Sequence, residues 1–212
     1  MKIYKHSDSY DITLKSDHTP ITIADRQAHL KIKESLGKTR IPILSEEGRE
    51  MLYDERRNWE LFWLVDPLDG TVEFIKRNNE FTVNIALLAE GECVGSVLYV
   101  PCLKKMYIAA KGKGAYLIRN IEPCDNPQYE GKQIEAMLER LPLESNRHEG
   151  FRMAVSRSHQ TPETLERIAH MRELHPDLEL IEQGSSYKFC LLAEGAVDYY
   201  VRTTNTYEWD TA

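Results

Sequence analysis

The sequence predicts an α/β protein in which helices and sheets form layers, and three stretches support this prediction. Residues 21–36 place apolar side chains at helical spacing, whereas residues 61–65 (LFWLV) form a continuous apolar run of strand length. After residue 150, strand-like and helix-like segments alternate along the chain. Together these patterns indicate sheets with helices packed against them.

The first 120 residues are interpreted as an N-terminal α/β subdomain. Its helix over residues 21–36 starts near Thr22 or Asp25 and ends at Gly37. Strands are expected at residues 41–44, 61–65, 81–89, 95–100 and 106–110. The Glu-Gly-Glu stretch at 90–92 is typical of a hairpin, which favours antiparallel pairing in this part.

Residues 121–149 are polar and rich in turn formers, with a short helix expected around 134–141, and are interpreted as a linker. Residues 150–212 then form an incomplete C-terminal α/β subdomain. Thr161 and Pro162 are a strong helix start, as N-cap and first helical residue. The elements expected here are strands at 153–156, 178–181 and 197–201 and helices at 162–174 and 185–193, the second closed by Gly195.

Composition restricts the function. The chain has 212 residues, 42% hydrophobic and 29% charged, with a net charge of -7, which argues against a nucleic-acid-binding surface. Its four cysteines form no CxxC pair, so neither a zinc site nor a disulfide framework is predicted. The N-terminus lacks a signal-peptide core, and no apolar run approaches the ~20 residues of a membrane span. We expect a cytoplasmic protein, with peripheral association at the inner membrane as an open alternative.

The segment DPLDGT at residues 66–71 directly follows the apolar strand at 61–65. Asp66 and Asp69 are held on rigid structure, and the proline and glycine of the segment force a tight turn. Hard cations such as Mg²⁺ take oxygen ligands, so these aspartates, one of Glu46 or Glu47, and the carbonyl of Leu68 form a candidate metal site. An ordinary turn after a strand is the alternative for the segment alone.

A further acid, Asp210, lies in the motif WDTA at residues 209–212. Asp is a favoured helix N-cap, and in isolation this structural role is the expected one. The alternative is a further metal ligand.

Three blocks, LSEE at 44–47, WLVDPLDGT at 63–71 and WDTA at 209–212, resemble the signatures of the inositol monophosphatase-like superfamily. The residues after the second block, VEFIKRNNEFTVNIA at 72–86, look like its 3'(2'),5'-bisphosphate nucleotidase branch. The resemblance also covers SRSH at 156–159 and GSSYKFC at 184–190. It implies the superfamily fold of alternating layers of helices and sheets (αβαβα), here truncated at both ends.

The resemblance also implies the roles of individual residues. The expected ligands of two or more Mg²⁺ ions are Glu46, Asp66, Leu68 through its carbonyl, Asp69 and Asp210. Glu46 is carried over as a catalytic residue as well, together with Thr71 and Asp25, which help to activate a water molecule. The residues expected to bind the substrate are Asp69, Gly70, Thr71, His159, Ser185, Lys188, Arg202 and Asp210.

The implied activity is magnesium-dependent hydrolysis of 3'-phosphoadenosine 5'-phosphate to AMP and phosphate, so the partner is a small phosphorylated nucleotide. Another phosphatase of the superfamily, acting on inositol or sugar phosphates, is one alternative. A non-catalytic metal-binding or nucleotide-binding module is another. Ser185 as a helix cap, Lys188 as a solvated helix residue and Arg202 as a surface cation are the structural alternatives for these side chains.

Overall fold

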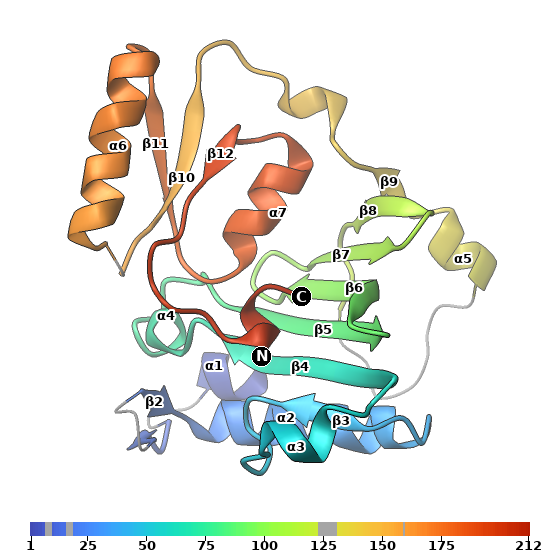
Figure 1. Ribbon diagram of the computed structural model, residues 1–212. Coiled ribbons are helices and arrows are strands. Elements are labelled where there is room, and N and C mark those ends of the chain that lie inside the picture. Colours follow the sequence, from blue (N-terminus) through green and yellow to red (C-terminus); the bar gives the residue numbers. More distant parts are fainter. Residues whose placement is uncertain (7–9, 16–18, 123–130, 159) are drawn as a thin grey trace.

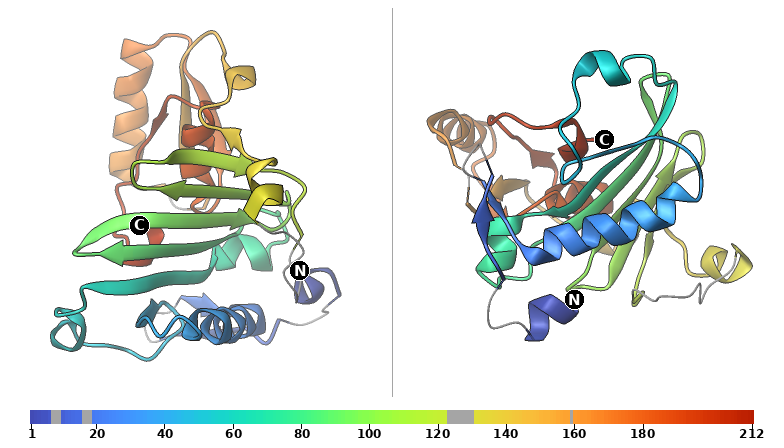
Figure 2. Two further views of the ribbon diagram at one scale, coloured as in Figure 1. Left: turned by 90° about the vertical axis from the view of Figure 1, so that its right-hand side faces the viewer. Right: turned by 90° about the horizontal axis from the view of Figure 1, so that it is seen from below.

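Two β-sheets and the helices beside them make up the fold (Figure 1). The computed structural model describes residues 1–6, 10–15, 19–122, 131–158 and 160–212. The layers follow one another as helix α2 (Ile23–Gly37), a seven-stranded sheet, helix α7 (Tyr187–Glu194), a three-stranded sheet and helix α6 (Pro162–Leu174) (Figures 1 and 2). This αβαβα order agrees with the predicted layered α/β fold.

The seven-stranded sheet has the order β3-β4-β5-β6-β7-β8-β9. Its strands are β3 (Ile43–Ser45), β4 (Leu61–Asp69), β5 (Thr82–Ala89), β6 (Glu92–Val100), β7 (Lys105–Ala110), β8 (Gly114–Ile118) and β9 (Glu139–Arg140). β3 is parallel to β4, and the other neighbouring pairs are antiparallel. Glu90 and Gly91 join β5 to β6 with φ values of 51° and 80°, which confirms the predicted hairpin.

Helix α2 lies along one face of this sheet, against β3 and β4 (Figure 2). Thr22 is its N-cap, and the Thr22 hydroxyl accepts a hydrogen bond from the Ala24 amide at 3.1 Å. In return the carboxylate of Asp25 accepts one from the Thr22 amide at 2.8 Å, which completes a capping box. This reciprocal cap fixes the start of the helix and holds Asp25 in the interior, 1% exposed.

The three-stranded sheet is parallel and has the order β11-β10-β12. Its strands are β10 (Arg152–Ser156), β11 (Glu179–Gln183) and β12 (Tyr199–Tyr200). Met153 and Val155 of β10 are buried against Ile168 and Met171 of α6, while α7 packs against β10 and β12. Loops at the carboxyl ends of such strands are where α/β sheets usually bind ligands.

The remaining elements are short. They are α1 (Lys2–His6), β1 (Thr13–Leu14), β2 (Pro20–Ile21), α3 (Tyr53–Arg56), α4 (Thr71–Ile75), α5 (Gly131–Glu135), η1 (Glu144–Asn146) and η2 (Glu208–Asp210). Tyr4 of α1 packs against Phe74 of α4, with ring centroids 5.0 Å apart. This aromatic contact holds the start of the chain under the helix that follows the DPLDGT segment.

Several segments differ from the prediction, and strand β8 (Gly114–Ile118) is not among the expected ones. The helix expected at 134–141 ends at Glu135, and residues 139–140 instead form β9, which pairs with the edge of β8. Backbone pairing with a distant strand therefore overrides local helical preference. The seven-stranded sheet consequently extends to Arg140, inside the segment interpreted as a linker. The strand expected at 61–65 is also longer, since β4 runs to Asp69.

Candidate active site

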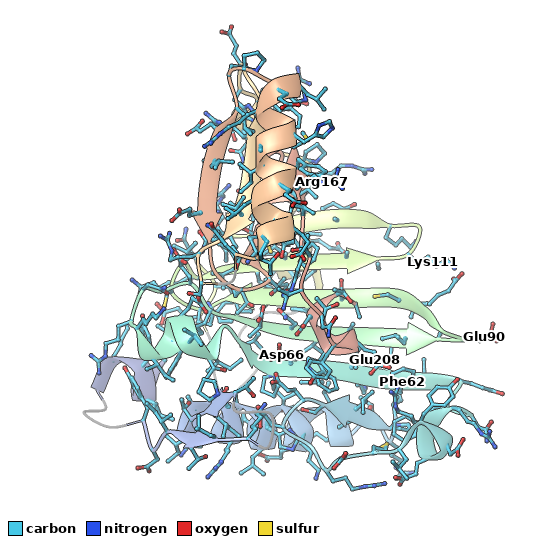
Figure 3. All side chains as sticks on the ribbon, turned by 60° about the vertical axis from the view of Figure 1, so that its left-hand side comes forward. Phe62, Asp66, Glu90, Lys111, Arg167 and Glu208 are labelled. Carbon is cyan, nitrogen blue, oxygen red and sulfur yellow. The ribbon has the colours of Figure 1, made fainter. Side chains whose placement is uncertain are left out.

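Three aspartates from distant parts of the chain meet at one end of β4. Asp66 and Asp69 belong to β4, and Asp210 is the last residue of η2, which packs against β4 and β5. One carboxylate oxygen of each aspartate lies within 4.8 Å of those of the other two. Figure 3 shows Asp66 on the sheet beside the turn that carries Glu208. Carboxylates this close together can share one divalent cation.

The DPLDGT segment contains a strand irregularity rather than a simple turn after a strand. Asp66 pairs with Asn84 and Asp69 with Thr82, and the register shifts between the two aspartates. Such a bulge redirects side chains, and here both carboxylates lie on the same side of the sheet end. The Leu68 amide also donates to Asp66 Oδ1 at 3.0 Å, which is the local turn contact that Asp-Pro sequences favour.

Burial makes the aspartate cluster electrostatically costly without a cation. Asp66 is 1% exposed, and burial raises its pKa well above the usual range of a carboxyl. The nearby carboxylates of Asp69, Glu46 and Asp210 raise this pKa further. Burial also raises the pKa of Asp210. A group of oxygen donors with excess negative charge fits a hard divalent cation, because the cation would neutralise the repulsion.

The two glutamates after β3 share one cation but lie differently. Glu46 follows β3, and its amide donates to the Val65 carbonyl at 3.0 Å, which places it beside the end of β4. Lys15 Nζ lies 2.7 Å from Glu46 Oε1 and 2.6 Å from Glu47 Oε1. Glu46 lines the cavity described below and helps to raise the pKa of Asp66. Of the two glutamates, Glu46 is therefore the one placed to join the aspartates.

Thr71 and Asp25 are in direct contact, although 46 residues separate them in the chain. The Thr71 hydroxyl donates to Asp25 Oδ1 at 3.1 Å and lies 3.4 Å from the Leu68 carbonyl. Thr22 holds the other oxygen of Asp25, through its amide at 2.8 Å and its hydroxyl at 2.5 Å. Asp25 is thus both a first-turn helix acid and the partner of Thr71.

A cavity of about 200 Å³ opens beside the acids. Its walls come from the end of β4, the start of α4, the carboxyl ends of the small sheet and the segment leading to η2. The predicted site residues that line it are Glu46, Asp69, Gly70, Thr71, Ser185, Lys188, Arg202 and Asp210. His159 lies outside the described residues. The fold therefore brings the other predicted substrate residues, from both halves of the chain, to one cavity.

Lys188 is a buried cation at the wall of this cavity, so a solvated helix position is the wrong description of it. Its side chain is 3% exposed, and Nζ donates to the carbonyls of Gln183 at 3.1 Å and Ser185 at 2.6 Å. The ammonium also lies over the ring of Tyr200, 5.4 Å from the centroid. Burial lowers the pKa of Lys188 to about 8, with Asp69 opposing this shift and Arg202 adding to it.

The segment after β11 touches the metal side of the site directly. The Ser186 amide donates to Asp69 Oδ2, and Gly70 adopts a φ of 91°, which favours glycine. A Cβ on Gly70 would lie 3.0 Å from the Ser185 Cβ and 3.1 Å from the Glu80 carbonyl. Ser185 Oγ also accepts the Tyr187 amide at 3.3 Å, although the N-cap residue of α7 is Ser186.

Arg202 connects the small sheet to the acidic cluster. Its Nη2 lies 3.8 Å from Asp210 Oδ2, and its Nε donates to the Thr204 hydroxyl at 3.0 Å. Asp210 Oδ2 accepts the Tyr207 amide at 3.0 Å, so Asp210 stands at the end of a short 3₁₀ turn rather than at a helix N-cap. Both charged groups face the cavity.

Several neighbours of the site were not predicted from the sequence. They are Lys15 beside Glu46, Ser186 beside Asp69, and Tyr200 beneath Lys188. The first two contacts join residues 31 and 117 positions apart. No local pattern indicates such pairs, because only the folded chain brings them together.

The sequence matches the inositol monophosphatase family over residues 2–212, and the chain therefore belongs to that family. Family members depend on metal ions, and the carboxylate cluster of this chain provides a donor set of that kind. Among the residues that the structure describes, no helix is both long and apolar enough to cross a membrane.

Within the family, the chain is similar to proteins of one type. It is 42% identical to the 3'(2'),5'-bisphosphate nucleotidase CysQ of Salmonella typhimurium (strain LT2), over 100% of this chain and 78% of the relative. CysQ of Escherichia coli (strain K12) is 40% identical over the same shares. The crystal structure of CysQ from Bacteroides thetaiotaomicron has a TM-score of 0.88 and 46% identity, covering 99% of this chain and 76% of that chain.

Proposed function

We propose that the chain is a magnesium-dependent 3'(2'),5'-bisphosphate nucleotidase that hydrolyses 3'-phosphoadenosine 5'-phosphate to AMP and phosphate. The main support is that one cavity is lined both by acids and by two cations, the buried Lys188 and the exposed Arg202. A substrate with two phosphates can then place the reacting one at the acids and the other near Lys188 and Arg202. The similarity to CysQ proteins over the whole chain supports the same substrate.

Glu46, Asp69 and Asp210, which line the cavity, and beside them Asp66 and the Leu68 carbonyl are the groups that would hold two Mg²⁺ ions. When bound, Mg²⁺ lowers the pKa of a water molecule and neutralises charge on the phosphate and on the leaving oxygen. The side chains alone repel an anionic substrate, so the cations are also needed to admit the phosphate.

Thr71 and Asp25 orient and deprotonate the attacking water in this proposal. Because the Thr71 hydroxyl donates its hydrogen to Asp25, its oxygen lone pairs remain free to accept a hydrogen bond from water. As the water oxygen bonds to phosphorus, its proton passes toward this pair, and the bond from phosphorus to the 3' oxygen of the ribose breaks. The 3' oxygen leaves as a hydroxyl after it takes up a proton from a solvent water molecule.

Elsewhere in the lining of the cavity, Ser185, Lys188 and Arg202 bind the second phosphate. Two hydrogens of the Lys188 ammonium are directed to carbonyls, and an ammonium has three, which leaves one for a phosphate oxygen. Arg202 offers a planar guanidinium suited to phosphate oxygens. In this proposal, these residues give the site its preference for a bisphosphate over a simple monoester.

The test is phosphate release with MgCl₂ from 3'-phosphoadenosine 5'-phosphate and from inositol 1-phosphate in parallel. We expect the nucleotide to be the better substrate by kcat/KM, and a preference for the inositol ester would refute the proposal. Asp69→Asn separates an enzyme from a non-catalytic binding module. In an enzyme it should reduce turnover by orders of magnitude, whereas a binding module has no turnover to lose.

We further propose a cytoplasmic location. Cys93, Cys102 and Cys190 are free thiols in the described part of the chain, which suits a reducing compartment. Fractionation of cells that express the tagged chain would test this, and recovery with the membrane or periplasmic fraction would contradict it.

A further inference from the structure

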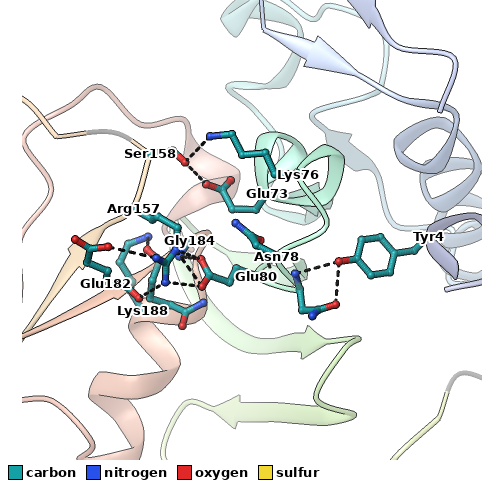
Figure 4. A network of polar contacts seen from close by, with 12 residues as sticks. Tyr4, Glu73, Lys76, Asn78, Glu80, Arg157, Ser158, Glu182, Gly184 and Lys188 are labelled. Atoms are coloured by element: carbon teal, nitrogen blue, oxygen red, sulfur yellow. Dashed lines mark hydrogen bonds and ion pairs between the residues drawn. The ribbon is translucent and has the colours of Figure 1, made fainter. Parts of the chain in front are cut away.

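A cluster of polar contacts joins the two sheets next to the cavity (Figure 4). Glu80 precedes β5 of the large sheet, and Arg157 follows β10 of the small one. Arg157 Nε lies 2.9 Å from Glu80 Oε2, and Arg157 Nη2 lies 2.8 Å from Glu80 Oε1. This two-point contact fixes both distance and angle between its partners, unlike a single-point surface ion pair.

Arg157 is held by the protein and is not available to a phosphate. Besides its two contacts with Glu80, Nη2 donates to the Glu182 carbonyl at 2.9 Å, and Nη1 lies 3.3 Å from Glu182 Oε2. Its guanidinium is thus bound between two carboxylates. The cluster therefore acts as a connection between the sheets and does not form an additional anion site.

Glu80 also holds the backbone that leads into the cavity. Its Oε2 accepts the Gly184 amide at 2.8 Å. The main chain at Gly184 approaches the large-sheet half so closely that a Cβ there would lie 2.4 Å from Glu73 Cγ. Glu73 in turn accepts a hydrogen bond from the Ser158 hydroxyl at 2.6 Å. Two segments of the small-sheet half are thus attached to the residues that follow the DPLDGT segment.

The attached backbone carries two of the residues proposed to bind the second phosphate, Ser185 and Lys188. Gly184 is followed immediately by Ser185, and the Lys188 ammonium donates to the carbonyls of Gln183 and Ser185 on either side of Gly184. Lys188 and this turn therefore move as one unit. The Ser186 amide donates to Asp69 and so attaches one end of this turn to the acidic cluster, while the Gly184–Glu80 contact fixes its other end.

We propose that Glu80 is a positioning residue that sets the spacing between the acidic cluster and the residues proposed to bind the second phosphate, and so favours substrates with two phosphates over those with one. The inference rests on the proposed function. Glu80 does not line the cavity in the described residues, and its side chain is 14% exposed, so it acts through Gly184 and Arg157 rather than by touching substrate.

The first measurement does not depend on activity. Amide hydrogen exchange at residues 184–188 is compared between the wild-type chain, Glu80→Ala and the control Glu182→Ala. The control removes Glu182, the other carboxylate that contacts Arg157. The Glu182 side chain is 54% exposed and makes no contact with the Gly184 amide in the described structure. We expect at least about tenfold faster exchange for Glu80→Ala and wild-type exchange for the control. Unchanged exchange in Glu80→Ala overturns the proposal.

The second measurement compares KM and kcat for 3'-phosphoadenosine 5'-phosphate and for adenosine 3'-phosphate, which lacks the second phosphate. Glu80→Ala should raise KM for the bisphosphate about tenfold, with kcat within about twofold and KM for the monophosphate unchanged. Glu80→Gln keeps an acceptor for Gly184 and should restore KM to within about threefold of wild type. Equal losses with both substrates, or no rescue by glutamine, overturn the proposal.

The same data separate this inference from the proposed function. If the wild-type chain shows no preference for the bisphosphate, the proposed function fails, and the specificity role of Glu80 fails with it. If the preference exists and survives in Glu80→Ala, only the inference about Glu80 fails.

Discussion

Replacing Thr71 by alanine tests whether the Thr71–Asp25 pair takes part in proton transfer. The Thr71 hydroxyl donates to Asp25 Oδ1 at 3.1 Å, while Oδ2 of Asp25 already accepts two hydrogen bonds from Thr22. The substitution leaves Oδ1 without this donor in a residue that is 1% exposed. An unsatisfied buried acceptor costs about 1–3 kcal/mol of stability. Loss of a positioned proton-transfer group typically lowers the rate by about 10²–10⁴-fold.

We therefore expect Thr71→Ala to lower kcat by about 10²–10⁴-fold and to remain folded with a reduced unfolding midpoint. The assay is phosphate release from 3'-phosphoadenosine 5'-phosphate with saturating MgCl₂, together with thermal unfolding with and without MgCl₂. Thr71→Ser is the matched control because it keeps the hydroxyl, and it should stay within about tenfold of wild type. A kcat of Thr71→Ala within about threefold of wild type would refute the assignment of Thr71 to the reaction.

Two further predictions concern titratable groups of the site. Because burial lowers the pKa of Lys188 to about 8, its ammonium is lost as the pH rises through that value. We expect kcat/KM for the bisphosphate to decline above pH 8 in the wild type and no such decline in Lys188→Arg; a decline that persists in the arginine variant assigns it to another group. Burial and neighbouring acids raise the pKa of Asp66, so without metal its contribution to stability is largest at low pH and is lost as the pH rises through the folded-state pKa. Asp66→Asn should raise the metal-free unfolding midpoint at pH 7 and abolish most of the gain from Mg²⁺, which is about 2.7 kcal/mol at one hundred times Kd. An Asp66→Asn chain that gains as much from MgCl₂ as the wild type contradicts the proposed ligand role.

Local signals in the sequence predicted most of the elements. The helix from Pro162 to Leu174 has the predicted ends, because the Thr161 cap and the proline after it act within one turn. The hairpin at Glu90 and Gly91 follows from the positive φ values that its two turn residues adopt. Strand β9 was missed because its partner β8 lies more than twenty residues away, and backbone pairing at that distance leaves no periodic pattern.

The candidate site was predictable to the extent that acids followed apolar strands. Asp66 and Asp69 are carried by β4. They lie near Glu46 because β3, which precedes Glu46, pairs in parallel with β4. That Asp210 lies close to Asp66 and Asp69 was expected only from the family resemblance. The sequence before Asp210 predicts no helix or strand that would place it there. Lys188 shows the limit most clearly. Lys188 is buried because α7 packs between the two sheets, which brings its ammonium to the Ser185 carbonyl.

The sequence by itself determined where the acidic motifs stand, which strands carry them and, through the family resemblance, which chemistry they suit. The tertiary structure alone decided how these residues are held: Lys188 is buried, the Thr71 hydroxyl donates to Asp25, and Glu80 and Arg157 connect the two sheets. The physical reason is the distance along the chain over which the responsible interactions act. Caps, turns and strand ends are set by neighbours within a few residues, whereas the spacing between the acids and the two cations results from packing and hydrogen bonds among segments that are distant in the chain.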